Sequence, residues 1–133
     1  RCTVMGLSWG RIPVPVLYGS YAMPDLIVGA DLFYNSYDID AILATIAPVF
    51  SSNPECVFLV SYQERGGTLV DLTVCLAQWD MEANPLDAKL ECLLGDAMND
   101  EQFTSIHLVE IRTTRTGSTR PDEKSDPTVR NAV

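Results

Sequence analysis

Polar and aromatic side chains follow each of three apolar runs in this chain of 133 residues. Trp9 follows the first run, Asp31 and Tyr34 follow the second, and Arg65 follows the third. The carboxyl ends of parallel strands meet at one edge of a sheet, where such sheets bind ligands. A carboxylate can orient a cationic nitrogen, and an aromatic face can stabilise positive charge or stack on a flat base. The spacing therefore predicts a small-molecule or peptide site at this edge.

Each of these residues also has a purely structural interpretation. Trp9 could pack on the sheet edge, and Asp31 could cap a turn. Tyr34 could be half-buried with its hydroxyl in water, and Arg65 could pair with a nearby acid. The single histidine, His107, shares a predicted strand face with apolar residues, which favours a core role over a catalytic one. The residue types alone leave both interpretations open.

The elements that must position these side chains are indicated by the spacing of apolar residues. Five segments have the apolar content of strands: residues 3–7, 26–30, 57–61, 81–86 and 106–111. Pro85 makes the fourth of them an edge strand. Helical spacing over 39–50 predicts a helix capped by Ser36, and a second helix is expected to begin at Thr68 as its cap. Residues 90–94 could form a short helical turn.

Alternating strands and helices predict an α/β domain with a parallel sheet and helices on both faces. The strand–helix–strand unit over 26–61 should be parallel and right-handed. A doubly wound nucleotide-binding fold usually opens with a strand and a glycine-rich turn, but no G-x-G-x-x-G segment is present, so the sheet is expected to be incomplete. We expect one domain over 1–112 and a disordered tail over 113–133, where large apolar residues are nearly absent.

Charge and hydropathy bear on the class of partner. The net charge is −9, and residues 1–111 alone carry four basic and fifteen acidic residues, which gives −11. Such a surface repels nucleic-acid phosphates and attracts a basic peptide, although many soluble proteins are acidic without having such a partner. No apolar stretch reaches the length of about 18 residues that a membrane span needs. We therefore predict no nucleic-acid and no membrane partner.

The cysteines argue against a metal site and for a reducing compartment. None of the four cysteines forms a C-x-x-C pair, and one histidine is too few for a zinc ligand set. Cys56 and Cys75 fall in apolar patterns typical of reduced core thiols, which fits the cytosol or nucleus. A P-loop and a G-x-S-x-G elbow are also lacking, so phosphate-loop and serine-hydrolase chemistry have little support.

Two segments carry a resemblance to a known family. Residues 6–10 read G-L-S-W-G, and residues 25–34 read D-L-I-V-G-A-D-L-F-Y. They are similar to the L-x-W-G and D-x-I-x-x-[AS]-D-x-x-[YF] segments of the lysine methyltransferase-related family often called family 16. The members are protein methyltransferases that use S-adenosylmethionine (SAM), and the resemblance covers roughly residues 2–112.

The resemblance implies a fold and a set of site residues. The fold would be a partial Rossmann-like seven-stranded SAM methyltransferase sheet that lacks its first two strands. The chain would then be the C-terminal part of such a domain, and by itself it would bind SAM weakly. Trp9 would border the adenine of SAM, and Ala30 would lie against the cofactor. Asp31 and Tyr34 would line the methyl-transfer cleft.

A narrower resemblance concerns the substrate. Residues 40–46, 61–65 and 78–81 are similar to one family member that methylates arginine in histone H3. That implies an arginine methyltransferase of nucleus and cytoplasm, which acts on chromatin in transcriptional activation. Gly29 before Ala30 is closer to lysine-directed members, so a lysine methyltransferase is one alternative, and a non-catalytic binding module is another.

Overall fold

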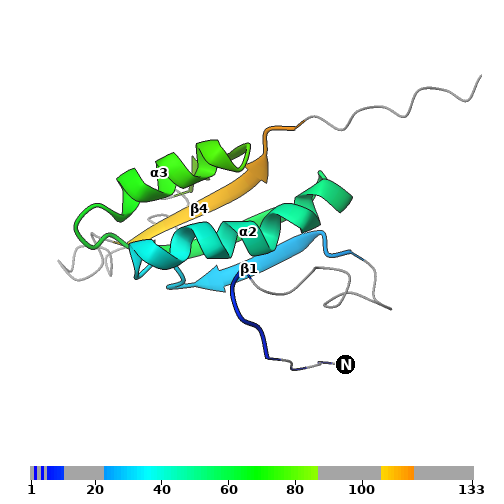
Figure 1. Cartoon of the computed structure of the whole chain (residues 1–133), viewed down its shortest axis with the longest axis horizontal. Coiled ribbons are helices and arrows are strands. Elements are labelled where there is room, and N and C mark those ends of the chain that lie inside the picture. Colours follow the sequence, from blue (N-terminus) through cyan, green and yellow to red (C-terminus); the bar gives the residue numbers. More distant parts are fainter. Residues whose placement is uncertain (1, 3, 5, 11–22, 87–105, 116–133) are drawn as a thin grey trace, which may run out of the picture.

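The computed structural model describes residues 2, 4, 6–10, 23–86 and 106–115. Figure 1 shows two helices packed beside a twisted sheet. In chain order the elements are β1 (Leu26–Ala30), α2 (Ser36–Ser52), β2 (Val57–Gln63), α3 (Thr68–Gln78), β3 (Met81–Pro85) and β4 (Ile106–Thr113). The predicted α/β class is confirmed.

The strand–helix–strand unit has the predicted arrangement. β1 and β2 are parallel neighbours, with Leu26 opposite Val57 and Ala30 opposite Ser61. α2 connects them, and its core-facing residues recur at the three- and four-residue spacing of a helix. β2 continues to Gln63, two residues beyond the predicted end. The carboxyl ends of β1 and β2 consequently lie at the same edge of the sheet.

The sheet is mixed, so the prediction of a parallel sheet is wrong. Its strand order is β1-β2-β4-β3, and β4 runs antiparallel to both of its neighbours. An apolar strand pattern carries no information about direction, because side-chain alternation is the same in parallel and antiparallel strands. The prediction that the segment around Pro85 forms an edge strand is confirmed for the described part of the chain, where β3 pairs with β4 alone.

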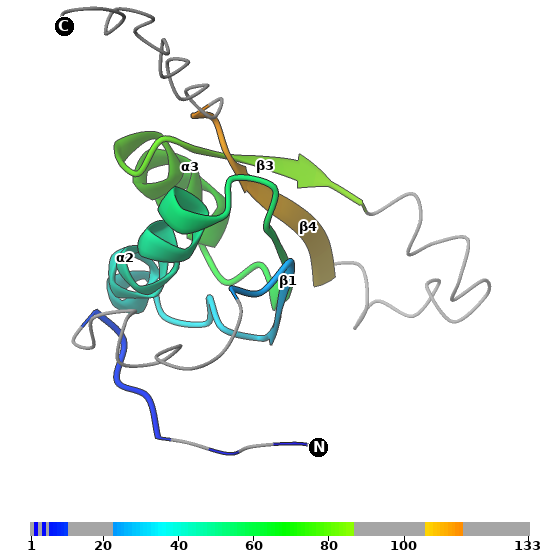
Figure 2. The same cartoon turned by 90° about the vertical axis from the view of Figure 1, so that its right-hand side faces the viewer.

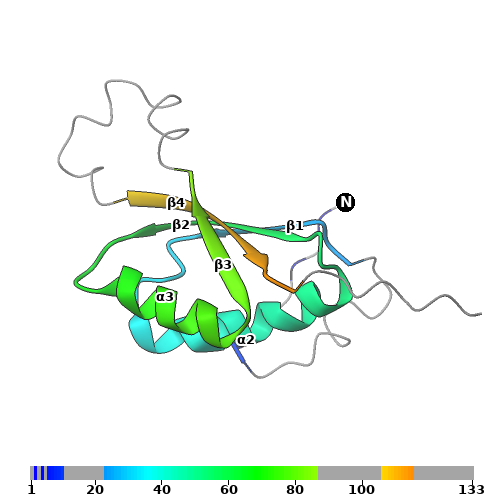
Figure 3. The ribbon, with the colours of Figure 1, turned by 90° about the horizontal axis from the view of Figure 1, so that it is seen from above.

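Both helices lie on the same face of the sheet, as seen from above in Figure 3. The prediction of helices on both faces is therefore wrong for the part of the chain that the structure describes. On the opposite face of β1, Leu26 and Val28 are 55% and 69% exposed. A continuous apolar run predicts burial on both faces, but burial requires a covering element, which the run itself does not provide.

Three predicted segments have limited or no description in the structure. Of the strand predicted over 3–7, the described residues Val4, Gly6 and Leu7 form no strand, and the other two lie outside the described residues. The helical turn predicted over 90–94 also lies outside them, as does the tail from 116 onward. The last strand extends through Thr113, so the first residue assigned to the tail belongs to β4. No helix in the described segments has the length and apolar character to cross a bilayer.

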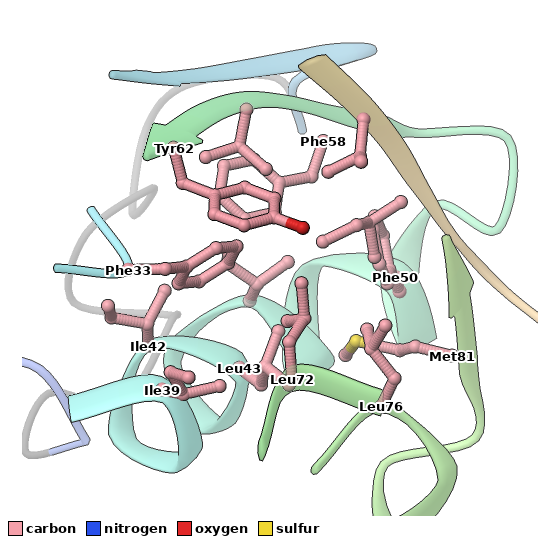
Figure 4. Packing of buried hydrophobic residues seen from close by; sticks show 14 of the residues in the cluster. Phe33, Ile39, Ile42, Leu43, Phe50, Phe58, Tyr62, Leu72, Leu76 and Met81 are labelled. Carbon is pink, nitrogen blue, oxygen red and sulfur yellow. The ribbon is translucent and has the colours of Figure 1, made fainter. Parts of the chain in front are cut away.

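The core lies between the helices and the covered face of the sheet. Figure 4 shows Phe33, Phe58 and Tyr62 pointing toward one another above the apolar face of α2. The ring of Phe33 meets the ring of Phe58 edge to face, with centroids 6.2 Å apart, and the ring of Tyr62 at 5.9 Å. Such pairs add about 0.5–1.5 kcal/mol beyond the burial of their area. Phe33 thus holds the loop after β1 in the core.

The two helices begin at caps that differ from those predicted. Asn35 caps α2, because its side-chain oxygen accepts a hydrogen bond from Tyr37 N at 3.2 Å, and Ser36 is already the first helical residue. Gly67 is the N-cap of α3 and has a left-handed φ of 118°. The α3 amides are satisfied instead by Glu64, whose carboxylate accepts from Gly67 N at 2.8 Å and Leu69 N at 2.9 Å. A carboxylate there also favours the helix dipole.

Gly29 lies in close packing against Leu32 and Phe58, which yields a testable consequence. A Cβ at this position would lie 2.5 Å from Leu32 Cδ1 and 3.1 Å from the ring of Phe58. Gly29→Ala should therefore lower the free energy of unfolding by about 1–3 kcal/mol, as overpacking does elsewhere. Urea denaturation measures this change. Gly6→Ala is the matched control, because nothing lies within 4 Å of a Cβ there. Equal unfolding free energies for Gly29→Ala and wild type would contradict the packing argument.

Candidate functional site

The loop after β1 is held against the end of β2 by its own backbone. The amide of Asp31 donates a hydrogen bond to the carbonyl oxygen of Ser61 at 2.8 Å. Asp31 also adopts a left-handed φ of 51°, a conformation that aspartate and asparagine tolerate better than most residues. The backbone therefore sets the position of the Asp31 carboxylate at the carboxyl edge of the sheet.

Three of the site residues predicted from the sequence meet at this edge. Arg65 Nη2 lies 3.2 Å from Asp31 Oδ2 and donates a second hydrogen bond to Gln63 Oε1 at 3.2 Å. The guanidinium carbon of Arg65 also lies 6.0 Å from the centroid of the Tyr34 ring, within cation–π range. The structure thus brings together Asp31, Tyr34 and Arg65, which are separated by up to 34 positions in the chain.

All three side chains are open to solvent. The side chains of Arg65 and Asp31 are 41% and 56% exposed, and Tyr34 is 59% exposed. An ion pair with this exposure contributes about 0–1 kcal/mol, because water screens both charges. The cluster is therefore accessible to a ligand, and the ion pair is weak enough to be broken by one.

Two neighbouring residues have structural roles. Glu64 caps α3, so Arg65 pairs with the more distant acid Asp31. His107 lies beside the buried ring of Tyr62, with centroids 5.3 Å apart. His107 itself is only partly buried, so it lies at the margin of the core and not within it as predicted.

Trp9 is positioned by a different element. The amide of the next residue, Gly10, donates to Thr45 Oγ1 at 2.8 Å, and Gly10 packs against Ala41 with a φ of 72°. Both partners belong to α2, and Figure 2 shows the described end of this segment beside that helix. Trp9 is 37% exposed. Among the residues that the structure describes, no hydrogen bond or ring contact joins it to Asp31 or Tyr34.

The residues predicted to contact SAM have surfaces that suit it. Ala30, at the carboxyl end of β1, is exposed and small, so a ligand could approach the end of this strand closely. Trp9 presents part of an aromatic plane, on which an adenine could stack. These two side chains are compatible with the cofactor that the sequence resemblance implies.

The described residues offer no metal site, and the buried thiol of Cys56 is poorly suited to chemistry. No group of three or more histidine, cysteine, aspartate or glutamate side chains there is placed to hold a metal ion. Cys56 is buried and free, and burial raises the pKa of its thiol, with the nearby Asp25 charge acting in the same direction. A raised pKa keeps the thiol protonated and unreactive near neutral pH. This agrees with the predicted core role of Cys56.

Several vertebrate proteins are similar to this chain over part of their length. The "Histone-arginine methyltransferase METTL23" of Mus musculus is 37% identical over 79 residues, which are 59% of this chain and 30% of the mouse protein. The Xenopus laevis protein of the same name is 27% identical over 113 residues, 81% of this chain and 47% of its own length. The chain is distantly homologous to METTL23.

The METTL23 match confirms the predicted resemblance, but it covers only part of each relative. The human METTL23 protein is 36% identical over 81 residues, and the match covers 40% of its length. The chain thus matches less than half of each of these METTL23 proteins. No family model matches the chain.

Proposed function

We propose that this chain is part of a SAM-dependent protein methyltransferase that modifies arginine, with histone H3 as its substrate. The observation that carries the proposal is that Asp31 and Tyr34 both contact Arg65 at the carboxyl edge of β1 and β2, with both side chains more than half exposed. The homology to proteins named histone-arginine methyltransferases supports the same conclusion. We also propose that the protein acts in the nucleus and the cytoplasm.

In this mechanism the protein mainly positions the acceptor nitrogen. The Asp31 carboxylate would accept hydrogen bonds from the substrate guanidinium, and the Tyr34 ring would lie against its positive charge. Bound SAM supplies an activated methyl group on a positively charged sulfur. Holding the nitrogen in one orientation removes much of the entropic barrier to the transfer. Trp9 and Ala30 are proposed to contact the cofactor and take no part in the chemistry.

The proposal of arginine over lysine as the target rests on the homology to METTL23 and on the cluster of Asp31, Tyr34 and Arg65. Gly29 does not decide between the two targets. The Gly29–Ala30 pair suggested lysine-directed family members, but the close approach of Leu32 and Phe58 gives a packing reason for a glycine there. Packing therefore explains this residue without reference to the substrate. A lysine methyltransferase is the alternative, and the identity of the methylated residue distinguishes the two.

Trp9→Ala should weaken SAM binding more than it changes the rate of transfer at saturating SAM. The indole would contribute stacking on the adenine, which is worth about 1–3 kcal/mol for base–aromatic contacts, or roughly 5- to 160-fold in affinity. Calorimetry on the full-length protein measures this change. We expect residues 1–133 alone to bind SAM poorly. Unchanged SAM affinity in the variant would remove Trp9 from the cofactor site.

The test of the proposed function is methylation of histone H3 by the full-length protein. Recombinant H3 is incubated with isotopically labelled SAM, and the modified residue is located by mass spectrometry. We expect label on arginine and not on lysine. Label on lysine alone would establish the alternative target, and no transfer to H3 would contradict the proposal.

A further inference from the structure

Arg65 presents a guanidinium group to the same two side chains that would hold the guanidinium of the substrate. We propose that Arg65 is an internal stand-in for the substrate arginine and competes with it for Asp31 and Tyr34. This inference rests on the proposed function and adds to it the class of group that the site prefers, a guanidinium over an ammonium.

The surroundings of Arg65 offer its guanidinium group two hydrogen-bond acceptors and an aromatic ring. One nitrogen, Nη2, donates to the Asp31 carboxylate and to the Gln63 amide oxygen, each at 3.2 Å. The Tyr34 ring lies 6.0 Å from the guanidinium carbon. A planar fork can use acceptors and a ring face at the same time, whereas an ammonium is a compact point charge. A site with these partners should favour arginine derivatives.

The Arg65–Asp31 contact is also suited to being displaced. It uses one nitrogen of Arg65 and is open to solvent at both side chains. The pair formed by Arg115 and Asp80 is different, because both Nε and Nη2 of Arg115 donate to Asp80 Oδ2. A weak, solvent-exposed pair leaves Asp31 free for part of the time, so an incoming guanidinium can take its place. The apparent affinity for that guanidinium falls with the fraction of Asp31 that is occupied.

Arg65→Met tests this competition because it keeps an unbranched stem but removes the charge and the donors. The chain of residues 1–133 is titrated with methylguanidinium, and the amide signals of Asp31 and Tyr34 are followed by NMR. An exposed ion pair of the usual strength predicts a two- to fivefold lower dissociation constant in the variant, about 0.4–1 kcal/mol at 1.36 kcal/mol per tenfold. Wild type should bind methylammonium more weakly than methylguanidinium.

Two control variants identify the cause. Arg115→Met removes another aspartate-paired arginine whose contacts lie at β4 and Asp80, and it should leave methylguanidinium binding unchanged. Arg65→Met combined with Asp31→Asn should lose the gain in affinity. A dissociation constant that is equal or higher in Arg65→Met would overturn the proposal and make Arg65 a residue that positions Asp31.

The titration requires neither SAM nor histone, so its outcome is separate from that of the methylation assay. Binding of methylguanidinium that is strengthened by Arg65→Met, without transfer to H3, would support the competition and contradict the proposed activity. Transfer to H3 arginine without strengthened binding would support the proposed activity and contradict the competition. In the full-length enzyme, the competition also predicts a two- to fivefold lower KM for an arginine peptide in Arg65→Met, with little change in kcat.

Discussion

Asp31→Asn is expected to lower the rate of methyl transfer by the full-length protein about ten- to a hundredfold. The substitution keeps the size of the side chain and one acceptor oxygen but removes the charge that would hold the substrate nitrogen. A charge-assisted hydrogen bond contributes roughly 1.5–3 kcal/mol, which corresponds to that change in rate. The measurement is turnover on histone H3 with thermal stability followed in parallel.

The folded state should tolerate Asp31→Asn well. Asparagine adopts the left-handed region readily, which suits the φ of 51° at this position, and the carboxylate is 56% exposed. Asp80→Asn is the matched control, since Asp80 also has a left-handed φ, 53°, and also pairs with an arginine. Only the Asp31 variant should lose activity. Equal turnover by Asp31→Asn and wild type would remove Asp31 from the mechanism, and lost stability with unchanged turnover per folded molecule would give it a structural role.

Phe33→Ala should lower the free energy of unfolding by about 3–5 kcal/mol, the usual cost of truncating a buried aromatic residue. Phe33 is fully buried and meets the rings of Phe58 and Tyr62 edge to face. It also lies in the loop between Asp31 and Tyr34, so its loss should leave both site residues less well held. Urea denaturation gives the change in stability.

Phe33→Leu serves as the control for that measurement, because it retains much of the apolar volume and loses only the ring contacts. It should cost clearly less than Phe33→Ala. An Ala variant within about 1 kcal/mol of wild type would show that the loop after β1 is not anchored by this ring.

Local sequence patterns were sufficient to predict the central unit of the fold. The apolar run 26–30, the helical spacing over 39–50 and the apolar run 57–61 correspond to β1, α2 and β2. Short connections force such a unit to be parallel, so the carboxyl ends of both strands had to meet at one edge. The placement of Asp31, Tyr34 and Arg65 near one another is a direct consequence, because all three follow these strand ends.

Tertiary structure decided the features that depend on which elements become neighbours. The antiparallel direction of β4 and the packing of both helices on one face are set by long-range pairing, which a strand pattern does not encode. The caps of α2 and α3 are Asn35 and the pair Gly67–Glu64, because several polar residues at each helix start compete and the backbone geometry selects among them. Likewise, several acids could have paired with Arg65. The close approach of the β1 and β2 ends selects Asp31, since the hydrogen bond from Asp31 N to Ser61 O holds that carboxylate within reach of the guanidinium.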